Sequence, residues 1–409
     1  MHYGKYRRNG VEVTDLGSER GTPRLDTFYY AFGVAKPGKT LLVEVDEVPP
    51  ILPEAADHTG KSDDDLVAEL AALIRTSIRN TPIEAVSLSG GLDSAIVAVV
   101  AKPKIVFSCR YPDYDELGHA RVVADLIGAE HVIVEPTDVD AQETLPAIVG
   151  AVGQPIFPSS AVGNWKLDRA MQEHDVRNAA DGTGPDELFG GYIRYLLVCL
   201  EHMAVRAPEL RGYRHMIQRF WDQTTVNPAR RYYDLLRSGG LREGPPYDFV
   251  EAEFQAADGL VEAMTRVDLQ LEARGFVAMT SGCAREHGIA WHSPLISDEI
   301  AAFALGLPDR LKSDPVAALS GKPATKVILR NVARALGVPD QIINRTDKQG
   351  WVTPIARWFK GPLAGWVESL CASLAQRGYR PRSDPLRGEF DQSTFADVCL
   401  ELWLRYHDK

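Results

Sequence analysis

Cysteine is scarce in this sequence, and long apolar runs are missing. The five cysteines are scattered, without the paired spacing of a zinc site or the density of a disulfide framework, which indicates a reducing compartment. No stretch approaches the ~18 apolar residues of a membrane helix, and the N-terminus has charges but no apolar signal core. These absences predict a cytoplasmic protein that has no membrane partner.

An excess of positive charge is also missing. The net charge is −11 and the isoelectric point is about 5.5, so a large nucleic-acid footprint is not expected. The 409 residues are 45% hydrophobic and 25% charged, which is the composition of a globular protein. Their number predicts two or three domains with ample length to bury a core.

The string Ser89-Gly90-Gly91-Leu92-Asp93-Ser94 lies between a predicted strand over 85–88 and a predicted helix over 95–101. This string is not a Walker loop, because it lacks the Gly-Lys-Ser/Thr of that motif. It is not a dinucleotide fingerprint either, because the Gly-x-Gly-x-x-Gly spacing fails. A Gly-Gly turn alone is ordinary punctuation between a strand and a helix, but the full string is much rarer.

This loop has the properties of a phosphate site. Its small residues let a ligand approach the backbone, and we expect Ser94 to cap the helix, whose first N–H groups attract anions. Asp93 is unexpected there, because a carboxylate repels phosphate unless a metal ion lies between them. The loop therefore predicts Mg²⁺ bound to a polyphosphate.

The pattern around the loop alternates between strands and helices. An acid-rich helix is predicted to begin after Ser62, and further strands are predicted over 105–108, 131–134 and 176–180, with helices between them. Short buried strands that alternate with helices predict an α/β fold, a parallel sheet with helices on both faces. Ahead of this part, residues 28–34 and 40–45 predict two strands, and the remainder from Leu196 is largely helical by periodicity.

A second polar segment follows the strand over 176–180. It reads Asp181-Gly182-Thr183-Gly184-Pro185-Asp186-Glu187 and leads into Tyr192, so small residues are again followed by acids and a helix start. An acidic helix N-terminus is the plain structural alternative. Ligands of parallel sheets sit at the carboxyl ends of the strands, so we expect Asp186 to supply the second carboxylate of a metal–diphosphate site.

These motifs, in this order, resemble the synthetase domain of the asparagine synthetase family, which includes β-lactam and carbapenam synthetases and lasso-peptide cyclases. The string from Ser89 to Ser94 resembles the PP-loop of ATP pyrophosphatases. The match covers about 60–409, and it also rests on the following segments: Asp186 to Tyr192, Ser293-Pro294-Leu295, Leu307-Pro308 with Lys312, Lys326 to Arg330, Lys348 to Trp351, and Leu400 to Arg405. It implies a remnant N-terminal segment over 1–60, a PP-loop core over about 61–200 and a helical extension over about 201–409.

The resemblance also implies roles for individual residues. Asp93 and Asp186 would bind Mg²⁺, Lys326 would contact the phosphates, and Lys348 would stabilise the transition state of amide formation. Thr183, Gly184 and Tyr192 would line the substrate pocket. The residues that would hold ATP are Leu88, Ser89, Gly90, Gly91, Asp93, Ser94, Cys109, Asp181 and Gly182.

Three departures from the family pattern bear on the second half-reaction. The family's N-terminal glutaminase has a nucleophilic Cys after the initiator Met, whereas His2 stands here, so ammonia, a separate glutaminase or an amine on the substrate would supply nitrogen. The family's Gly-Glu-Gly reads Gly182-Thr183-Gly184, and threonine is a poor general base. The segment 292–297 and the interval between Arg345 and Lys348 also differ, which predicts a changed specificity.

The leading hypothesis is an AMP-forming amide or lactam synthetase of specialised metabolism that uses ATP and Mg²⁺. The first alternative is ammonia-dependent asparagine synthesis. Pyrophosphate release with aspartate and ammonia alone would favour it. A tRNA-modifying PP-loop enzyme would predict a basic surface and often paired cysteines, and a non-catalytic binding subunit is supported mainly by Thr183. A carrier protein and a homodimer stay open as partners.

Overall fold

The computed structural model describes residues 6–8, 11–13, 46–47, 52–112, 116–206, 227–236, 245–346, 353–379 and 392–408. The two strands predicted over 28–34 and 40–45 lie outside these residues. Near the N-terminus, three short strands form an antiparallel sheet in the order β2-β1-β3: β1 Tyr6–Arg8, β2 Val11–Val13 and β3 Asp46–Glu47.

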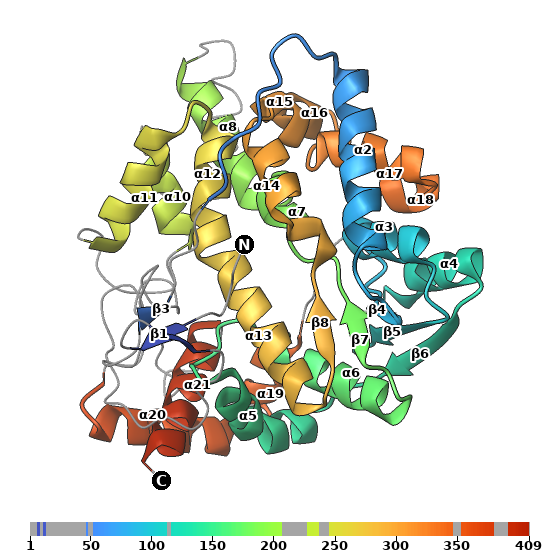
Figure 1. The fold of residues 1–409 in the computed structure, drawn as a ribbon. Coiled ribbons are helices and arrows are strands. Elements are labelled where there is room, and N and C mark those ends of the chain that lie inside the picture. Colours follow the sequence, from blue (N-terminus) through green and yellow to red (C-terminus); the bar gives the residue numbers. More distant parts are fainter. Residues whose placement is uncertain are drawn as a thin grey trace.

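A five-stranded sheet forms the centre of the fold (Figure 1). Every neighbouring pair is parallel, in the order β6-β5-β4-β7-β8. The strands are β4 Ala85–Ser87, β5 Ile105–Cys109, β6 Glu130–Val134, β7 Asn178–Ala180 and β8 Ala290–His292. The predicted α/β class with a parallel sheet is confirmed, while β8 was not predicted.

Helices cover both faces of this sheet because successive side chains of each strand point to opposite sides. Val86 and Val106 pack into one apolar cluster with helices on the first face, whereas Ala85 and Phe107 pack into another cluster on the second face. The helices of the sheet region are α2 Asp63–Arg79, α3 Leu92–Ala101, α4 Leu117–Ile127, α5 Asp138–Val152, α6 Ala161–Glu173, α7 Pro185–Leu188, α14 Asp298–Leu305, α15 Asp309–Lys312, α16 Pro315–Leu319, α17 Val327–Leu336 and α18 Asp340–Ile343, with a 3-10 turn η2 Pro294–Ile296.

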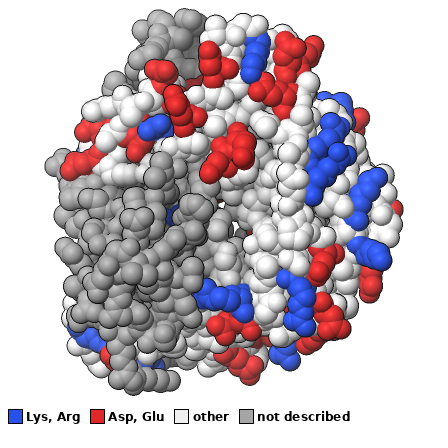
Figure 2. Space-filling view, viewed as in Figure 1, with Lys and Arg blue, Asp and Glu red and all other residues white. Residues whose placement is uncertain are grey.

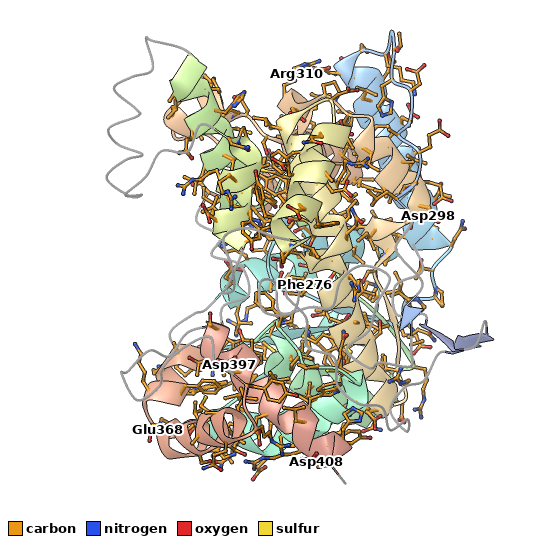
Figure 3. The ribbon with its side chains drawn as sticks, turned by 90° about the vertical axis from the view of Figure 1, so that its left-hand side faces the viewer. Phe276, Asp298, Arg310, Glu368, Asp397 and Asp408 are labelled. Atoms are coloured by element: carbon orange, nitrogen blue, oxygen red, sulfur yellow. The ribbon has the colours of Figure 1, made fainter. Side chains whose placement is uncertain are left out.

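Further helices form two groups beside the sheet. The prediction that the C-terminal part is largely helical is confirmed. Figure 3 shows Phe276 between them, with Glu368, Asp397 and Asp408 on the lower group. None of the described helices combines the length and apolarity that crossing a bilayer requires. These helices are α8 Ile193–Arg206, α10 Pro228–Leu236, α11 Pro245–Ala256, α12 Leu260–Gln270, α13 Glu272–Glu286, α19 Ile355–Lys360, α20 Ala364–Gln376 and α21 Gln392–His407.

Two local signals for helix ends, at Ser62 and Gly128, behave as the sequence indicates. The hydroxyl of Ser62 accepts a hydrogen bond from the Asp65 N–H at 3.2 Å, and the Asp65 carboxylate accepts one from the Ser62 N–H at 3.1 Å. This reciprocal capping fixes the start of α2. Gly128 ends α4 with φ +69°, a left-handed conformation that costs glycine little.

Charges of both signs are spread over the face of the molecule in Figure 2, among larger uncharged areas. The predicted absence of a nucleic-acid partner rests on the net charge of −11 and stays a prediction.

Asp168 on α6 is a fully buried carboxyl group. Neither of its oxygens has a hydrogen-bond partner in the part of the chain that the structure describes. Burial raises the pKa of Asp168 well above its usual value, since a charged carboxylate is costly in an apolar environment. The folded protein therefore holds this proton more tightly than the unfolded chain does.

Asp168→Asn is expected to remove a loss of stability at high pH. An acid whose pKa is higher in the folded state stabilises the protein at low pH, and this contribution is lost as the pH rises above about 4. The advantage of the variant over the wild type in free energy of unfolding should be about 2 kcal/mol larger at pH 8 than at pH 5. Urea unfolding at several pH values measures it, with the exposed Asp125→Asn as control. Parallel pH profiles of Asp168→Asn and wild type would contradict the expectation.

Candidate active site

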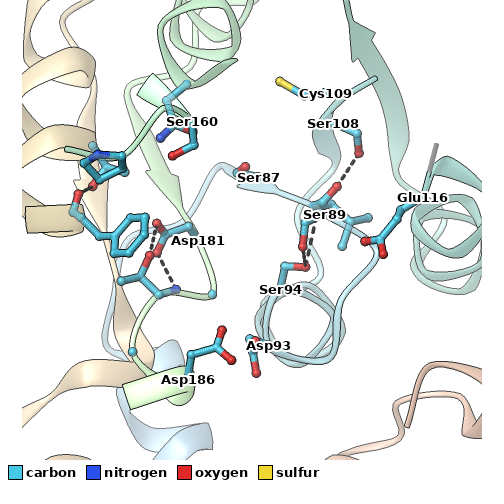
Figure 4. A pocket seen from close by; sticks show the side chains of 18 of the residues that line it. Ser87, Ser89, Asp93, Ser94, Ser108, Cys109, Glu116, Ser160, Asp181 and Asp186 are labelled. Carbon is cyan, nitrogen blue, oxygen red and sulfur yellow. Dashed lines mark hydrogen bonds between the residues drawn. The ribbon is translucent and has the colours of Figure 1, made fainter. Parts of the chain in front are cut away.

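A cavity of about 420 Å³ lies at the carboxyl ends of four neighbouring strands (Figure 4). Its lining includes Ser89 after β4, Cys109 at the end of β5, Asp181 after β7 and Trp291 on β8. Parallel strands point their carboxyl ends to the same edge of a sheet, which brings these segments together. The remaining predicted residues in the lining are Leu88, Asp93, Ser94, Gly182, Thr183, Gly184, Asp186 and Tyr192.

The loop between β4 and α3 differs from the prediction in one respect. Ser94 does not cap the helix, because α3 begins at Leu92 and its N-cap is Gly91, which has no side-chain cap hydrogen bond. The Ser94 hydroxyl instead accepts a hydrogen bond from the Ser89 N–H at 3.2 Å and donates one to the Gly91 carbonyl at 3.3 Å. The extended backbone of Gly91 starts the helix earlier than expected. Ser94 therefore closes the loop onto Ser89 and Gly91 instead of capping α3.

The loop after β7 crosses the loop after β4 at close range. A Cβ atom on Gly182 would lie 2.5 Å from the Ser94 nitrogen and 2.7 Å from the Asp93 carbonyl carbon. These are backbone atoms, so any larger residue would have to move the start of α3. Glycine at 182 is what allows the two motifs predicted from the sequence to meet.

Gly182→Ala is expected to lower the free energy of unfolding by about 3 kcal/mol, in the range of strong overpacking, and to weaken nucleotide binding. Gly118→Ala on α4 is the matched control, since its added Cβ has nothing within 4 Å. That control should be neutral or stabilise the protein by about 0.5 kcal/mol. Chemical denaturation measures both, and equal stability of the two variants would contradict the close approach.

A lysine lies between the two predicted metal-binding carboxylates. The Nζ atom of Lys326 is 2.6 Å from Asp93 Oδ2 and 2.7 Å from Asp186 Oδ1. Figure 4 shows the Asp93 and Asp186 side chains pointing toward one another. The Lys326 and Asp93 side chains are only 6% and 7% exposed, while that of Asp186 is 33% exposed. Burial alone lowers the pKa of Lys326, but the charges of Asp186 and Asp93 outweigh it, so the pKa is raised and the ammonium is kept.

The backbone of Lys326 is held in an uncommon conformation. Lys326 is the N-cap of α17 with φ +54°, in the left-handed region that few residues other than glycine adopt. Its N–H donates to the Phe189 carbonyl at 3.2 Å, which ties the turn to the segment after α7. This strained backbone directs the Lys326 side chain to Asp93 and Asp186.

Thr183, the residue that departs from the pattern expected from the resemblance, is hydrogen-bonded to Asp181. The Thr183 hydroxyl donates to Asp181 Oδ2 at 2.6 Å and the Thr183 N–H donates to Oδ1 at 3.0 Å. Ser293 also donates to Asp181 Oδ1, at 2.8 Å. The Thr183 hydroxyl therefore acts as a hydrogen-bond donor. Both carboxylate oxygens of Asp181 accept hydrogen bonds from Thr183 or Ser293.

Glu187 is a buried acid in the lining that sequence reasoning missed as a site residue. Burial, and then the charge of Asp186, raises the pKa of Glu187 to about 8. The Tyr192 hydroxyl donates to Glu187 Oε1 at 2.8 Å, and the Arg194 guanidinium lies 3.8 Å from the centre of the Tyr192 ring. In the sequence Glu187 is only the second acid of a helix start, so its burial could not be foreseen.

The thiol of Cys109, at the end of β5, is hydrogen-bonded to the backbone. The Cys109 thiol donates to the Gly163 carbonyl at 3.5 Å, and burial, followed by the charge of Asp168, raises the pKa of Cys109 well above its usual value, so it is a neutral thiol. Lys348 lies outside the described residues. Glu116 and Arg345 were not predicted as site residues. Arg345 stood out only as one end of the interval before Lys348, and no local sequence signal marks Glu116.

The chain is similar to one protein family over most of its length. The family model described as asparagine synthase matches residues 71–399. Among curated proteins, the glutamine-hydrolyzing asparagine synthetase 1 of Bacillus subtilis is 25% identical over 315 residues, covering 69% of this chain and 48% of that protein. A putative glutamine-hydrolyzing asparagine synthetase of Mycobacterium tuberculosis is 25% identical over 353 residues, covering 77% and 52%. The chain thus spans about half the length of these relatives.

Solved structures with similarity to the chain are more distant. NMN synthetase from Francisella tularensis has 12% identity and a TM-score of 0.23, covering 71% of this chain and 100% of its own. The glutamine-dependent NAD⁺ synthetase from Acinetobacter baumannii has 15% identity and a TM-score of 0.22, covering 55% and 38%. The parallel sheet and the helices around it define the fold.

Proposed function

The chain belongs to the asparagine synthase family, and we propose that it is an ATP-dependent carbon–nitrogen ligase that forms AMP and pyrophosphate. One observation carries this proposal: Lys326 is paired with Asp93 and Asp186 beside the N-terminus of α3. A cation, two carboxylates and a helix N-terminus together suit a metal–polyphosphate ligand.

The residues present fit a magnesium ion. Asp93 and Asp186 already share one cation, the Lys326 ammonium, so their carboxylates lie close enough to share another. Among the described residues, no group of three or more His, Cys, Asp or Glu could hold a metal by itself. Mg²⁺ is commonly bound by one or two carboxylates together with substrate phosphates, which matches this donor set. Bound there, it would neutralise phosphate charge and orient the leaving pyrophosphate.

In the first half-reaction, the chain would hold ATP by backbone and side-chain groups. The loop from Leu88 to Ser94 would take the phosphates, and Cys109, Asp181 and Gly182 would contact the nucleoside. A substrate carboxylate oxygen attacks the α-phosphorus, a new P–O bond forms, and the bond to pyrophosphate breaks. The Lys326 ammonium lowers the barrier because it balances charge that develops on the leaving group.

In the second half-reaction, an amine attacks the carbonyl carbon of the acyl-adenylate. The new C–N bond forms, the electron pair of the C–O bond leaves with AMP, and a proton leaves the nitrogen. Lys348 would stabilise the oxyanion of the tetrahedral step. Thr183 offers no base, since its hydroxyl donates to Asp181. We therefore propose an amide or lactam synthetase of specialised metabolism. An ammonia-dependent asparagine synthetase is the second candidate, and the similarity to asparagine synthetases supports it.

A pyrophosphate-release screen across amino acids and diamino acids, with and without ammonia, tests this proposal. Release that depends on Mg²⁺ and on one carboxylate is the expected result. Aspartate plus ammonia sufficing would favour the second candidate, and no release with any carboxylate would contradict ligase activity. A partner glutaminase, a carrier protein, a homodimer and a cytoplasmic location stay predictions that this screen does not address.

A further inference from the structure

Arg345 joins the segment after α18 to the phosphate loop. Its Nη1 donates to the Gly90 carbonyl at 3.0 Å, and its Nη2 is 2.6 Å from Glu116 Oε1. The Arg345 and Glu116 side chains are only 7% and 11% exposed, so this ion pair is largely out of water. None of the roles proposed above uses Arg345 or Glu116.

The contact with Gly90 fixes how one peptide of the loop is turned. Because a trans peptide is planar, its N–H points away from its carbonyl, and the Gly90 carbonyl faces Arg345. The Gly91 N–H therefore points the other way, toward Ser89 Oγ at 3.4 Å, and Ser89 lines the cavity. A carbonyl oxygen turned to the phosphates would repel them, whereas an N–H attracts them.

The contact with Glu116 balances a charge that borders the cavity. Glu116 lines the cavity, and Figure 4 shows it beside the loop after β4. Gly90 packs tightly there, since a Cβ on it would lie 2.8 Å from the Glu116 carbonyl oxygen. A carboxylate so placed would oppose a polyphosphate unless a cation neutralised it, and in the poorly solvated site its repulsion would be strong.

Arg345 is itself held by the helix that carries Lys326. The Arg330 guanidinium, on α17, donates to the carbonyls of Thr325 at 2.9 Å, of Arg345 at 3.4 Å, and of Ile343. The backbone of Arg345 and the turn before Lys326 are thus fixed to the same side chain.

We propose that Arg345 is a positioning residue for polyphosphate binding, which holds the Gly90 carbonyl away from the phosphates and neutralises Glu116. This inference rests on the proposed function, because it takes the polyphosphate of ATP as the ligand. It predicts that the harm of losing Arg345 comes largely from the carboxylate that is left behind. A residue that merely supported the fold would show no such dependence on Glu116.

The experiment is calorimetric titration of the full chain with α,β-methylene ATP and Mg²⁺, which requires no acyl substrate. Arg345→Gln is expected to weaken binding about 50-fold, in the range for breaking a buried charged hydrogen-bond pair. Glu116→Gln should bind the analogue at least as tightly as the wild type, because it removes a charge that repels the polyphosphate and keeps the Arg345 cation. The double variant should recover at least about tenfold of the loss. Arg334→Gln, half exposed on α17, is the matched control.

Several outcomes would overturn the inference. Unchanged binding by Arg345→Gln, a large loss with Glu116→Gln, or a double variant as weak as Arg345→Gln would each do so. If Arg345→Gln does not fold, Arg345→Lys replaces it, with an intermediate loss expected because lysine cannot form both contacts of the guanidinium fork. A wild type that binds nucleotide but forms no amide would contradict the proposed function alone. A wild type that binds no nucleotide would overturn both.

Discussion

Lys326→Met should reduce substrate-dependent pyrophosphate release by about 10³-fold, the upper end for removing one electrostatic stabiliser. The substitution keeps the length and apolar stem of the side chain and removes only the charge that lies between Asp93 and Asp186. The leaving pyrophosphate then lacks its lysine counter-charge. The measurement is initial-rate pyrophosphate release at saturating ATP. The control is Lys322→Met, because Lys322 is an exposed lysine that, like Lys326, precedes α17 in the chain.

The same variant carries a stability readout. Without the ammonium, Asp93 at 7% exposure faces a second carboxylate with no charge between them, which is expected to cost about 3 kcal/mol in free energy of unfolding. Added Mg²⁺ should restore part of this loss because it binds the folded pair better than the unfolded chain. A variant that keeps wild-type rates, or that loses stability with no response to Mg²⁺, would contradict the assigned arrangement.

Lys348→Ala should separate the two half-reactions. If Lys348 faces the oxyanion of the acyl-transfer step, amide formation should fall by about 10³-fold, while one equivalent of pyrophosphate is still released at nearly the wild-type rate. Single-turnover quench experiments that measure the acyl-adenylate and the amide product distinguish the adenylation step from the acyl-transfer step. An accumulated acyl-adenylate is the expected signature.

Lys360→Ala is the matched control for that experiment, since Lys360 is an exposed lysine near the same part of the chain. Equal loss of pyrophosphate release and amide formation in Lys348→Ala would place the lysine in the adenylation step instead. Intact product formation would remove it from the catalytic set.

The parts of the site that could be predicted from the sequence are those with local chemistry. Small residues between a strand and a helix have a direct backbone meaning, and Asp93 is informative because a carboxylate is out of place beside phosphates. Asp186 could be added because it also follows a strand of the predicted parallel sheet, and the structure shows that this strand, β7, pairs directly with β4. Their meeting with Lys326 was implied by the family resemblance and by no local pattern.

What sequence reasoning missed depends on tertiary context. The strand β8 is only Ala290-Trp291-His292, too short to show a periodicity, and it forms because the edge of β7 is available. Ser94 looks like a helix cap, yet the extended conformation of Gly91 starts the helix before it. Glu187 acquires its raised pKa through burial, and Arg345 acquires its contacts through partners distant in sequence; the local residue pattern encodes neither.

The position of β8 has a consequence for how the chain is synthesised. β7 pairs with β4 on one side and with β8 on the other, and β8 follows β7 by more than a hundred residues. Until the ribosome has released Ala290 to His292, the outer edge of β7 has backbone N–H and carbonyl groups with no strand to receive them. Such an edge can pair with another nascent chain. The described helices made in this interval, α7, α8 and α10 to α13, are therefore synthesised while the sheet is still open on that side, and the sheet is completed only when β8 follows.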